Sequence, residues 1–443
     1  MMTYEPLPQK KRVLWVLWDC GGNVAPQLTI GRRLVHRGYQ VRVIAPRSLQ
    51  RRIEHAELDY LAYRFAPEHD SLSPHLDLWK DFETRNPLTM FARLRDHVVY
   101  GTARAFFDEV CYALAAEPAD VVCSDFLLAG ALAAAEKAGV PSVAMMHTLY
   151  SLPHPGRPPL GLGCSPAQGT LGKLRDISLG WIIARLFNLG LQSFNQLRRE
   201  HGLQPLRSLF DQALMARRVL VLTSQAFDFP APHWPENVCF VGPQFDDLEW
   251  LAPWSSPWPS KAHNPLVLVS LSTSFMNQRA QIRRVIEAVT SLPIRVLLTI
   301  GPAFSPESFV APTHVVVRQF VPHLRVLPDT SIVVTHAGHG TVMAALSQGV
   351  PLVCLPMGRD QDDVAARVAW RGTGLVCSAH ATPMQLRTAI ERVLSEARFR
   401  QAAGIVRDEM ARLNGPLDAV REIAMVSGAQ LPISTPQNTA WRC

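Results

Sequence analysis

The 443-residue chain is predicted to be an α/β protein with two domains, each built on a doubly wound parallel sheet, that face each other across a cleft. Short apolar runs alternate with helical patterns in the first half, and the same alternation starts again at residue 265. A segment rich in Pro, Ser and Trp separates the two halves. We therefore expect domains at 1–241 and 265–428, a linker at 242–264 and a disordered, aperiodic tail at 429–443.

The apolar runs have the composition of strands that are buried on both faces of a sheet. They are the segments 12–19, 40–46, 119–125 and 140–147 in the first half, and 265–273, 294–301, 314–320, 331–336 and 351–356 in the second. Helical patterns lie between them, such as the alanine-rich run at 126–139. Open parallel sheets bind ligands beyond the carboxyl ends of their strands, so polar residues that directly follow these runs are the candidates for a site.

Composition and charge argue against several classes of function. The net charge of +7 comes mostly from dispersed arginines, which fits an anionic small molecule or a membrane surface better than a nucleic acid. No uninterrupted apolar run reaches about 18 residues, so we expect no transmembrane helix, and the apolar part of the N-terminus is too short for a secretion signal. The eight cysteines are scattered, which is typical of a reducing cytoplasm and predicts neither disulfides nor a metal site.

The stretch VVTHAGHGTVMAALSQGVPLVCLPMGRDQ, residues 333–361, carries most of the chemical information. Its strand ends at His336, and Gly338 and Gly340 precede a helix predicted to start at Val342. Backbone N–H groups at a helix start bind phosphate, and glycines let a ligand approach the backbone closely. His336 can donate to a phosphate oxygen, and Thr341 adds a hydroxyl. A glycine pair alone would indicate only a tight turn capped by the histidine. The choice between such a turn and a phosphate site therefore depends on the rest of the stretch.

Asp360 and Gln361 close the stretch and offer acceptors and donors for the vicinal hydroxyls of a sugar. The whole pattern resembles the donor-binding signature of family 1 glycosyltransferases, which include bacterial enzymes that glycosylate macrolides and other antibiotics. The 25-residue interval from His336 to Gln361 equals that of the family's plant signature. The resemblance implies that His336, Gly340 and Thr341 hold the diphosphate of a UDP- or dTDP-sugar, and that Asp360 and Gln361 hold its sugar.

The resemblance covers nearly the whole chain, more strongly in the second half, and implies a GT-B fold of two Rossmann-like domains. It also implies inversion at the anomeric carbon, no metal requirement, and a nucleotide sugar as co-substrate. Phe320 would stack on the nucleobase, and the backbone of Val321 would hydrogen-bond it. Ser272 and Thr273 would touch the phosphates. Two positions depart from the family pattern: Ser272 stands where glycine is common, and Ala344 replaces a ribose-binding glutamate, which leaves the choice of donor open.

The catalytic base is the part of the family pattern that this sequence does not reproduce. Family members usually carry a histidine in the first loop, oriented by an aspartate of the first domain. Here Asn23 in GGNVAP takes the place of the histidine, whereas Asp125 in VVCSDF matches the aspartate. An amide has no usable proton affinity near neutral pH, so Asn23 cannot be the base. The simplest structural interpretations are a turn residue that caps the next helix for Asn23 and a helix N-cap for Asp125.

Three explanations for the missing base stay open. Asp19 or His147, which both follow apolar runs, supplies the base from another direction, although a histidine at a strand end is often only structural. Alternatively, the acceptor is a phenol or an aromatic carbon that needs little help. Finally, the protein binds a nucleotide sugar or a partner without turnover.

Segments 81–101 and 147–169 are the least explained by a sheet, and the second is predicted to be a lid or an acceptor-binding loop. The apolar helical face at 179–197 favours core or acceptor-pocket wall over a membrane-surface helix, and peripheral membrane contact with a lipid or sterol acceptor is the lesser alternative. We therefore expect a cytoplasmic, monomeric or homodimeric glycosyltransferase that adds a sugar to a small apolar natural product through oxygen or carbon. The alternative is a non-catalytic nucleotide-sugar-binding protein or an activator of a glycosyltransferase complex.

Overall fold

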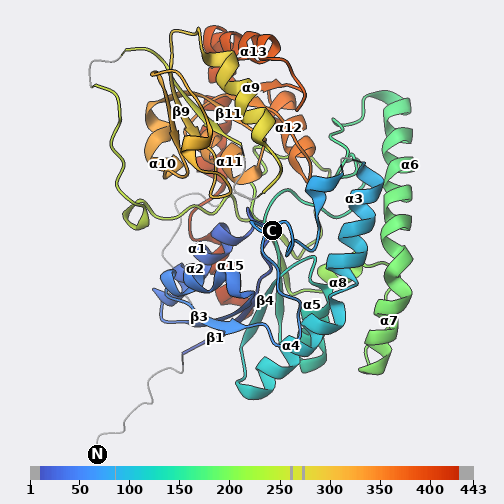
Figure 1. The fold of residues 1–443 in the computed structure, drawn as a ribbon. Helices are drawn as coiled ribbons and strands as arrows, with labels where there is room; N and C mark the ends of the chain where they lie inside the picture. Colours follow the sequence, from blue (N-terminus) through green and yellow to red (C-terminus); the bar gives the residue numbers. More distant parts are fainter. Residues whose placement is uncertain (1–9, 85, 260–262, 272–274, 429–443) are drawn as a thin grey trace, which may run out of the picture.

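The computed structural model describes residues 10–84, 86–259, 263–271 and 275–428. These residues form two α/β domains, which lie one above the other in Figure 1. The predicted tail at 429–443 and the predicted phosphate contacts Ser272 and Thr273 lie outside the described residues.

The lower domain in Figure 1 contains a seven-stranded parallel sheet with the order β3-β2-β1-β4-β5-β6-β7. Its strands are β1 (Arg12–Val16), β2 (Gln40–Ala45), β3 (Asp59–Ala62), β4 (Val121–Asp125), β5 (Ser142–Met146), β6 (Arg218–Val221) and β7 (Val238–Phe240). The accompanying helices include α1 (Val24–Val35), α2 (Gln50–His55), α4 (Ala103–Ala116), α5 (Ala129–Ala138), α7 (Leu191–Glu200) and α8 (Phe210–Leu214). The strand order reverses between β1 and β4, which is where such sheets open a ligand crevice.

The upper domain contains a six-stranded parallel sheet with the order β10-β9-β8-β11-β12-β13. Its strands are β8 (Leu266–Ser270), β9 (Arg295–Thr299), β10 (Val315–Arg318), β11 (Thr330–Thr335), β12 (Leu352–Cys354) and β13 (Gly374–Val376). Its helices are α9 (Arg279–Val289), α10 (His323–Val326), α11 (His339–Ser347), α12 (Gln361–Trp370), α13 (Pro383–Ser395) and α14 (Ala397–Leu413). The order reverses between β8 and β11, and the predicted fold class of two doubly wound sheets is confirmed.

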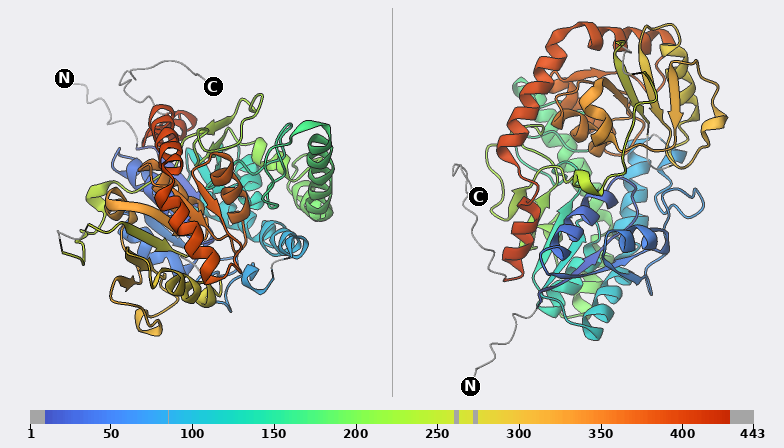
Figure 2. Two further views of the ribbon diagram at one scale, coloured as in Figure 1. Left: turned by 90° about the horizontal axis from the view of Figure 1, so that it is seen from above. Right: turned by 90° about the vertical axis from the view of Figure 1, so that its left-hand side faces the viewer.

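The last helix, α15 (Asp418–Val426), returns to the first domain. Val420 and Ile423 are fully buried in the same core as Val13 of β1 and Leu220 of β6. Figure 2 shows the C-terminal helices running from one domain down to the other. The segment predicted as the second domain, 265–428, therefore ends in a helix that packs in the first domain. The alternation of strands and helices in the sequence does not reveal this.

A buried ion cluster also joins the domains. Oδ1 of Asp228, a residue that follows β6, accepts hydrogen bonds from Arg157 and from Arg367 of α12, both at 2.6 Å. All three side chains are almost completely buried. Burial alone would raise the pKa of Asp228, but Arg367 and Arg157 hold it below its ordinary value. The carboxylate stays charged and ties the segment after β5 to the second domain.

Candidate active site

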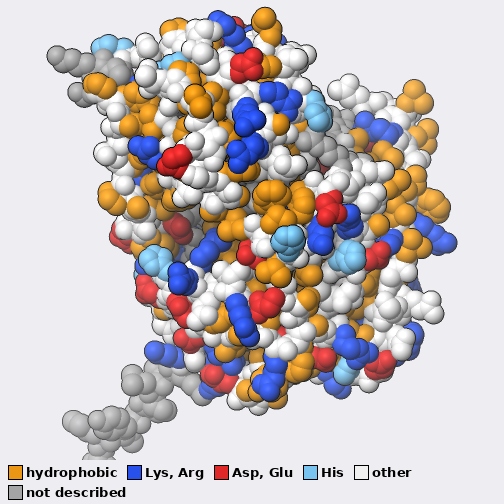
Figure 3. All heavy atoms as spheres, in the orientation of Figure 1, with side chains coloured by type: hydrophobic (Ala, Val, Ile, Leu, Met, Phe, Trp, Pro, Cys, Tyr) orange, Lys and Arg blue, Asp and Glu red, His pale blue; other side chains and the backbone are white. Residues whose placement is uncertain are grey.

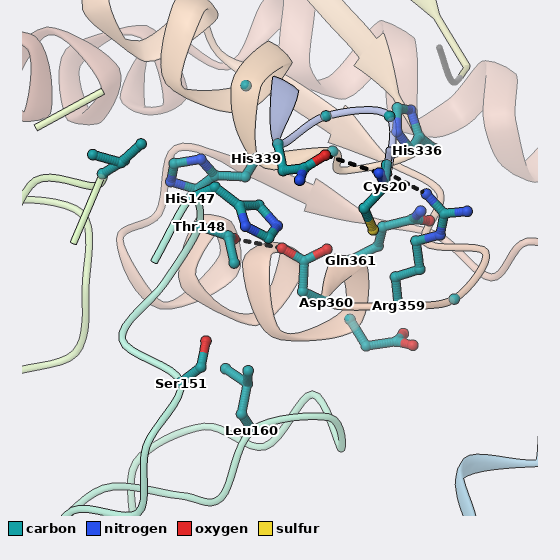
Figure 4. Close-up of a pocket in the computed structure, with 18 of the residues that line it drawn as sticks. Cys20, His147, Thr148, Ser151, Leu160, His336, His339, Arg359, Asp360 and Gln361 are labelled. Carbon is teal, nitrogen blue, oxygen red and sulfur yellow. Dashed lines mark hydrogen bonds between the residues drawn. The ribbon is translucent and has the colours of Figure 1, made fainter. Parts of the chain in front are cut away.

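A cavity of about 1840 Å³ lies between the two domains, at the carboxyl ends of both sheets. It brings together most of the residues that the sequence analysis selected from distant segments. The predicted residues that line it are Asp19, Asn23, His147, Phe320, Val321, His336, Gly338, Gly340, Thr341, Asp360 and Gln361. Figure 4 shows part of this cavity, with residues of both domains facing one another.

The start of α11 forms one end of the cavity. The helix begins at His339, before the predicted start at Val342, so the N–H groups of Gly340 and Thr341 belong to its first turn. Gly338 is the N-cap and makes no side-chain cap bond, and a Cβ on Gly340 would meet no atom within 4 Å. Uncapped N–H groups beside open space are able to bind an anion, which is the role that the sequence analysis predicts for this turn.

His336 lies beside these N–H groups, at the switch between β8 and β11, and is 8% exposed. Its Nδ1 is 3.3 Å from the carbonyl oxygen of Ser270. A carbonyl oxygen only accepts, so Nδ1 carries the proton of the neutral ring and Nε2 carries a lone pair. Burial lowers the pKa of His336 to about 4. The sequence-based expectation that His336 donates to a phosphate therefore requires a second proton, which the neutral ring does not carry.

Gly338 leaves room for the ring of His336. A Cβ built on Gly338 would lie 2.4 Å from Nε2 of His336, whereas Gly340 has free space. We expect Gly338→Ala to displace the ring and weaken nucleotide-diphosphate binding about 10- to 100-fold, the range for one hydrogen bond to a charged group. Calorimetric titration with UDP and dTDP measures this affinity, and thermal unfolding of Gly338→Ala and Gly340→Ala provides the matched control for folding. Unchanged affinity for both nucleotides in Gly338→Ala would contradict the assignment of His336 to the diphosphate.

Asp360 and Gln361 differ in what they present to the cavity. Oδ2 of Asp360 accepts a hydrogen bond of 2.5 Å from Oγ1 of Thr148, across the domain boundary. Gln361 is 2% exposed, and its amide is used within its own domain by the N–H of Met357 at 2.8 Å and by Sδ of Met276 at 3.3 Å. The carboxylate of Asp360 is thus the more accessible of the two predicted sugar contacts, as Figure 4 shows.

Two residues that form contacts between the domains were not selected from the sequence, although each adjoins a residue that was. Thr148 directly follows His147, and Arg359 precedes Asp360. Nη1 of Arg359 donates to the carbonyl oxygen of Cys20 at 2.9 Å, and the backbone of Arg359 has a positive φ of 58°. A non-glycine residue in this region is uncommon and is held there by its surroundings.

The predicted lid or acceptor loop at 147–169 lies against the second domain. The carboxylate of Asp363 in α12 accepts the backbone N–H groups of Gly161 at 2.5 Å and Gly163 at 3.2 Å. Burial raises the pKa of Asp363 to about 7. Through these bonds the loop after β5 is attached to α12, the helix that begins directly after Asp360.

Asp125 and His147 form a hydrogen-bonded pair beside the cavity, next to Thr148. Oδ2 of Asp125 is 3.1 Å from Nδ1 of His147, and Oδ1 accepts from the N–H of Leu127, also at 3.1 Å. Asp125 is completely buried, whereas His147 is partly exposed and lines the cavity. Burial would lower the pKa of His147, but Asp125 more than compensates and the pKa is raised. Helix α5 begins later, with Leu128 as its N-cap, so Asp125 is not the helix cap that the simpler interpretation predicts.

Asn23 and Asp19 have structural contacts instead. Oδ1 of Asn23 accepts the N–H of Cys20 and Nδ2 donates to the carbonyl oxygen of Trp18, both at 2.9 Å. Asn23 is a turn residue, as predicted, but its side chain makes no cap bond to α1. Asp19 accepts from the N–H of Gly21 and from the hydroxyl and N–H of Ser71, so both of its oxygens are engaged. The amide of Asn23 cannot take a proton near neutral pH, and the carboxylate of Asp19, which can, already accepts three hydrogen bonds.

The first-domain side of the cavity is apolar and rich in aromatic rings. Trp18 lies 6.5 Å from Trp79, centroid to centroid, and Phe91 of α3 (Pro87–Arg93) packs edge-on against Phe187 of α6 at 5.7 Å. Helix α6 (Gly169–Phe187) lines the cavity with one of its faces. The apolar pattern predicted at 179–197 is therefore partly pocket wall, although a break at 188–190 separates α6 from α7.

Comparisons with known proteins agree with this geometry. Residues 283–426 match the family described as "Erythromycin biosynthesis protein CIII-like, C-terminal domain". The chain is 28% identical over 421 residues to 4'-demethylrebeccamycin synthase of Lentzea aerocolonigenes, which covers 92% of this chain and 98% of that protein.

Two solved structures have the same fold. The glycosyltransferase of kitacinnamycin superposes with a TM-score of 0.73 at 21% identity and covers 95% of this chain and 100% of its own. Glycosyltransferase VinC in complex with dTDP has a TM-score of 0.68 at 20% identity, with coverages of 94% and 99%. Among the residues that the structure describes, no helix has both the length and the apolar character needed to cross a bilayer. The chain is a glycosyltransferase with the GT-B fold, and it resembles the bacterial natural-product glycosyltransferases.

Proposed function

We propose that the protein transfers a sugar from a dTDP- or UDP-sugar to a large apolar acceptor, with inversion and without a metal ion. One observation carries this proposal: His147, which is hydrogen-bonded to the buried Asp125, and the start of α11 line the same cavity from opposite domains. A base and a site for a leaving diphosphate are the two elements that a direct displacement at an anomeric carbon needs.

His147 is the base in this proposal. Its Nδ1–H donates to Asp125, which leaves the lone pair of Nε2 for the proton of an acceptor hydroxyl. The acceptor oxygen attacks the anomeric carbon as that proton leaves, and the bond from this carbon to the diphosphate oxygen breaks. Attack from the face opposite the leaving group in a single step inverts the configuration. In this proposal His147 takes over the role of the family's first-loop histidine, whose position Asn23 occupies here. Asp125 keeps the role of the orienting aspartate.

The diphosphate leaves with its charge against α11 and His336. These groups stabilise the charge that develops on the leaving oxygens, the role that a metal ion has in other transferases. At the mouth of the cavity, Phe320 is 72% exposed and Val321 is buried behind it, which suits a stacked nucleobase hydrogen-bonded to the backbone. The similar fold of VinC, whose structure contains dTDP, supports a nucleoside-diphosphate donor.

The acceptor side of the cavity suits a large hydrophobic molecule. Sites for drug-sized ligands have volumes of roughly 300–1,000 Å³, so a cavity of about 1840 Å³ has room for a nucleotide sugar together with a polycyclic acceptor. Trp18, Trp79, Phe91 and Phe187 provide flat apolar surfaces in the first-domain half. The name of the rebeccamycin relative supports a natural-product acceptor, and transfer to oxygen or carbon are both compatible with this wall.

The proposal is tested by offering dTDP- and UDP-sugars to the purified protein with a panel of phenols, macrolides and polycyclic aromatics. Products are detected by mass, their anomeric configuration by NMR, and their linkage by acid stability, since a C-glycoside resists hydrolysis. Transfer that persists in EDTA and inverts the anomeric centre is the expected result. Retention of configuration, or loss of transfer in EDTA that is restored by a metal, would reject those parts of the proposal. Tight nucleotide binding without transfer to any acceptor would favour the non-catalytic alternative.

A further inference from the structure

Helix α6 carries a large apolar surface on the outside of the molecule. Leu171, Leu174, Ile177, Trp181 and Ile182 are 81%, 59%, 69%, 68% and 42% exposed, and we call these five side chains the α6 outer face. At 100° per residue they share one broad side of the helix. Figure 1 places α6 at the edge of the first domain, and Figure 3 shows hydrophobic side chains with interspersed basic ones along that edge. A helix that is apolar on both its inner and its outer side normally has both sides covered.

The charged residues of α6 that reach the surface are all basic. Lys173 and Arg175 flank the α6 outer face, and Arg185 extends it towards the C-terminal end. The one acidic residue of the helix, Asp176, is buried and bonded to Arg175. Leucine, isoleucine and tryptophan bordered by lysine and arginine are typical of helices that lie in the interface of an anionic membrane.

The same face is continuous with the mouth of the active-site cavity. Ile177 and Lys173 are exposed and at the same time line the cavity. Deeper residues on the inner side of the helix, Ile183 and Phe187, form part of the apolar wall of the cavity. A surface seated on α6 would therefore adjoin the entrance through which a hydrophobic acceptor reaches the site.

We propose that the α6 outer face docks onto an anionic lipid surface, so that the cavity takes up its acceptor from the membrane. A second copy of the chain fits less well, because symmetric pairing of α6 would place two faces that each carry Lys173, Arg175 and Arg185 against each other, and the helix has no exposed acidic residue to offset them. Anionic headgroups supply the opposite charge, and acyl chains cover leucine, isoleucine and tryptophan. The docking part of the proposal does not depend on the proposed transfer reaction, since it concerns a surface outside the base and the donor site.

Flotation of the full chain with vesicles tests the docking without donor or acceptor. Pure phosphatidylcholine vesicles are compared with vesicles that contain phosphatidylglycerol, at low and high salt. We expect binding that requires phosphatidylglycerol and weakens with salt, and about fivefold weaker binding for Arg185→Gln, the contribution of one cation near the surface. The double variant Leu174→Glu/Trp181→Glu should lose binding. Its matched control is Met384→Glu/Ile405→Glu, which places the same charges on exposed apolar positions of α13 and α14 and should bind like the wild type.

Three results would overturn the proposal. The first is absence of vesicle binding by the wild type, and the second is equal binding by the two double variants. The third is a dimer in light scattering that Leu174→Glu/Trp181→Glu dissociates, because a second copy of the chain would then cover the α6 outer face. Transfer to a water-soluble acceptor should be the same in the wild type and in this variant, because neither residue lines the cavity. That assay separates failure of docking from failure of the proposed reaction.

Discussion

Replacing His147 with alanine is expected to lower kcat for sugar transfer by about 100- to 10,000-fold, the usual contribution of a general base. Affinity for UDP or dTDP should change much less than kcat, because His147 belongs to the first domain and adjoins Thr148, the partner of Asp360, although it also lies near His339 at the start of α11. The measurement is steady-state transfer together with calorimetric titration of the nucleotide. Asn23→Ala and Asp19→Asn are the comparisons: their side chains hold the first loop, so they should affect thermal stability more than the chemical step.

The pH profile distinguishes a base from a structural histidine. The base acts in its neutral form, so kcat/KM should rise as the pH rises through the pKa of His147, which Asp125 keeps above the ordinary value against the effect of burial. Asp125→Asn removes the charge that favours the protonated ring, so the rising limb should move to lower pH while the maximal rate falls. Wild-type activity in His147→Ala, or a limb that stays in place in Asp125→Asn, would contradict this assignment. An acceptor that is already ionised, such as a phenolate, should depend less on His147.

Binding of the nucleotide sugar is expected to take up about one proton, at His336. In the empty protein Nδ1 donates to Ser270 and Nε2 carries a lone pair. A phosphate oxygen beside Nε2 would repel that lone pair unless a proton lies between the two atoms. Burial holds the pKa of free His336 at about 4, and bound diphosphate should raise it. Asp360 and Arg359 also act on the ring, the first favouring and the second opposing the charged form.

The sign of the resulting pH dependence follows from linkage. Between the pKa of His336 in the free protein and its pKa in the complex, affinity for the nucleotide sugar should fall about tenfold for each unit of rising pH. Above the pKa of His336 in the complex, the affinity should level off. Calorimetry in buffers of different ionisation enthalpy measures the proton directly. A nucleotide sugar is the proper ligand, because it lacks the terminal phosphate of UDP that titrates in the same range. His336→Ala should bind weakly with no proton uptake, and equal uptake by this variant and the wild type would exclude His336 as the site.

The fold could be predicted from the sequence to the extent that its strands are long apolar runs. Segments such as 265–273 and 331–336 are recognisable because parallel strands buried on both faces consist mostly of Val, Ile and Leu. The strands β3, β6, β7 and β13 have three or four residues each and were not predicted, whereas the equally short β10 and β12 lie within the predicted runs 314–320 and 351–356. Helix α15 follows an ordinary helical pattern, and only packing reveals that it belongs to the other domain.

The candidate site was predicted one residue at a time, but its pairings were not. The rule that ligands bind beyond strand ends selected Asp125 and His147, and these become partners because β4 and β5 are neighbours with Asp125 opposite Met145. Neighbouring strands are not apparent in the sequence when they are joined by a helix. The contact between Thr148 and Asp360 depends on how the two domains meet, which no local pattern describes.

The return of α15 to the first domain limits how the cleft opens. The chain crosses between the domains twice, once through 242–264 and once between α14 and α15. Two bodies joined at one point can swing in any direction, whereas two bodies joined at two points turn only about the line through those points. Opening should therefore be a hinge rotation about a single axis. Each closure then returns Thr148 to Asp360, and with it His147 to the same position over the sugar site.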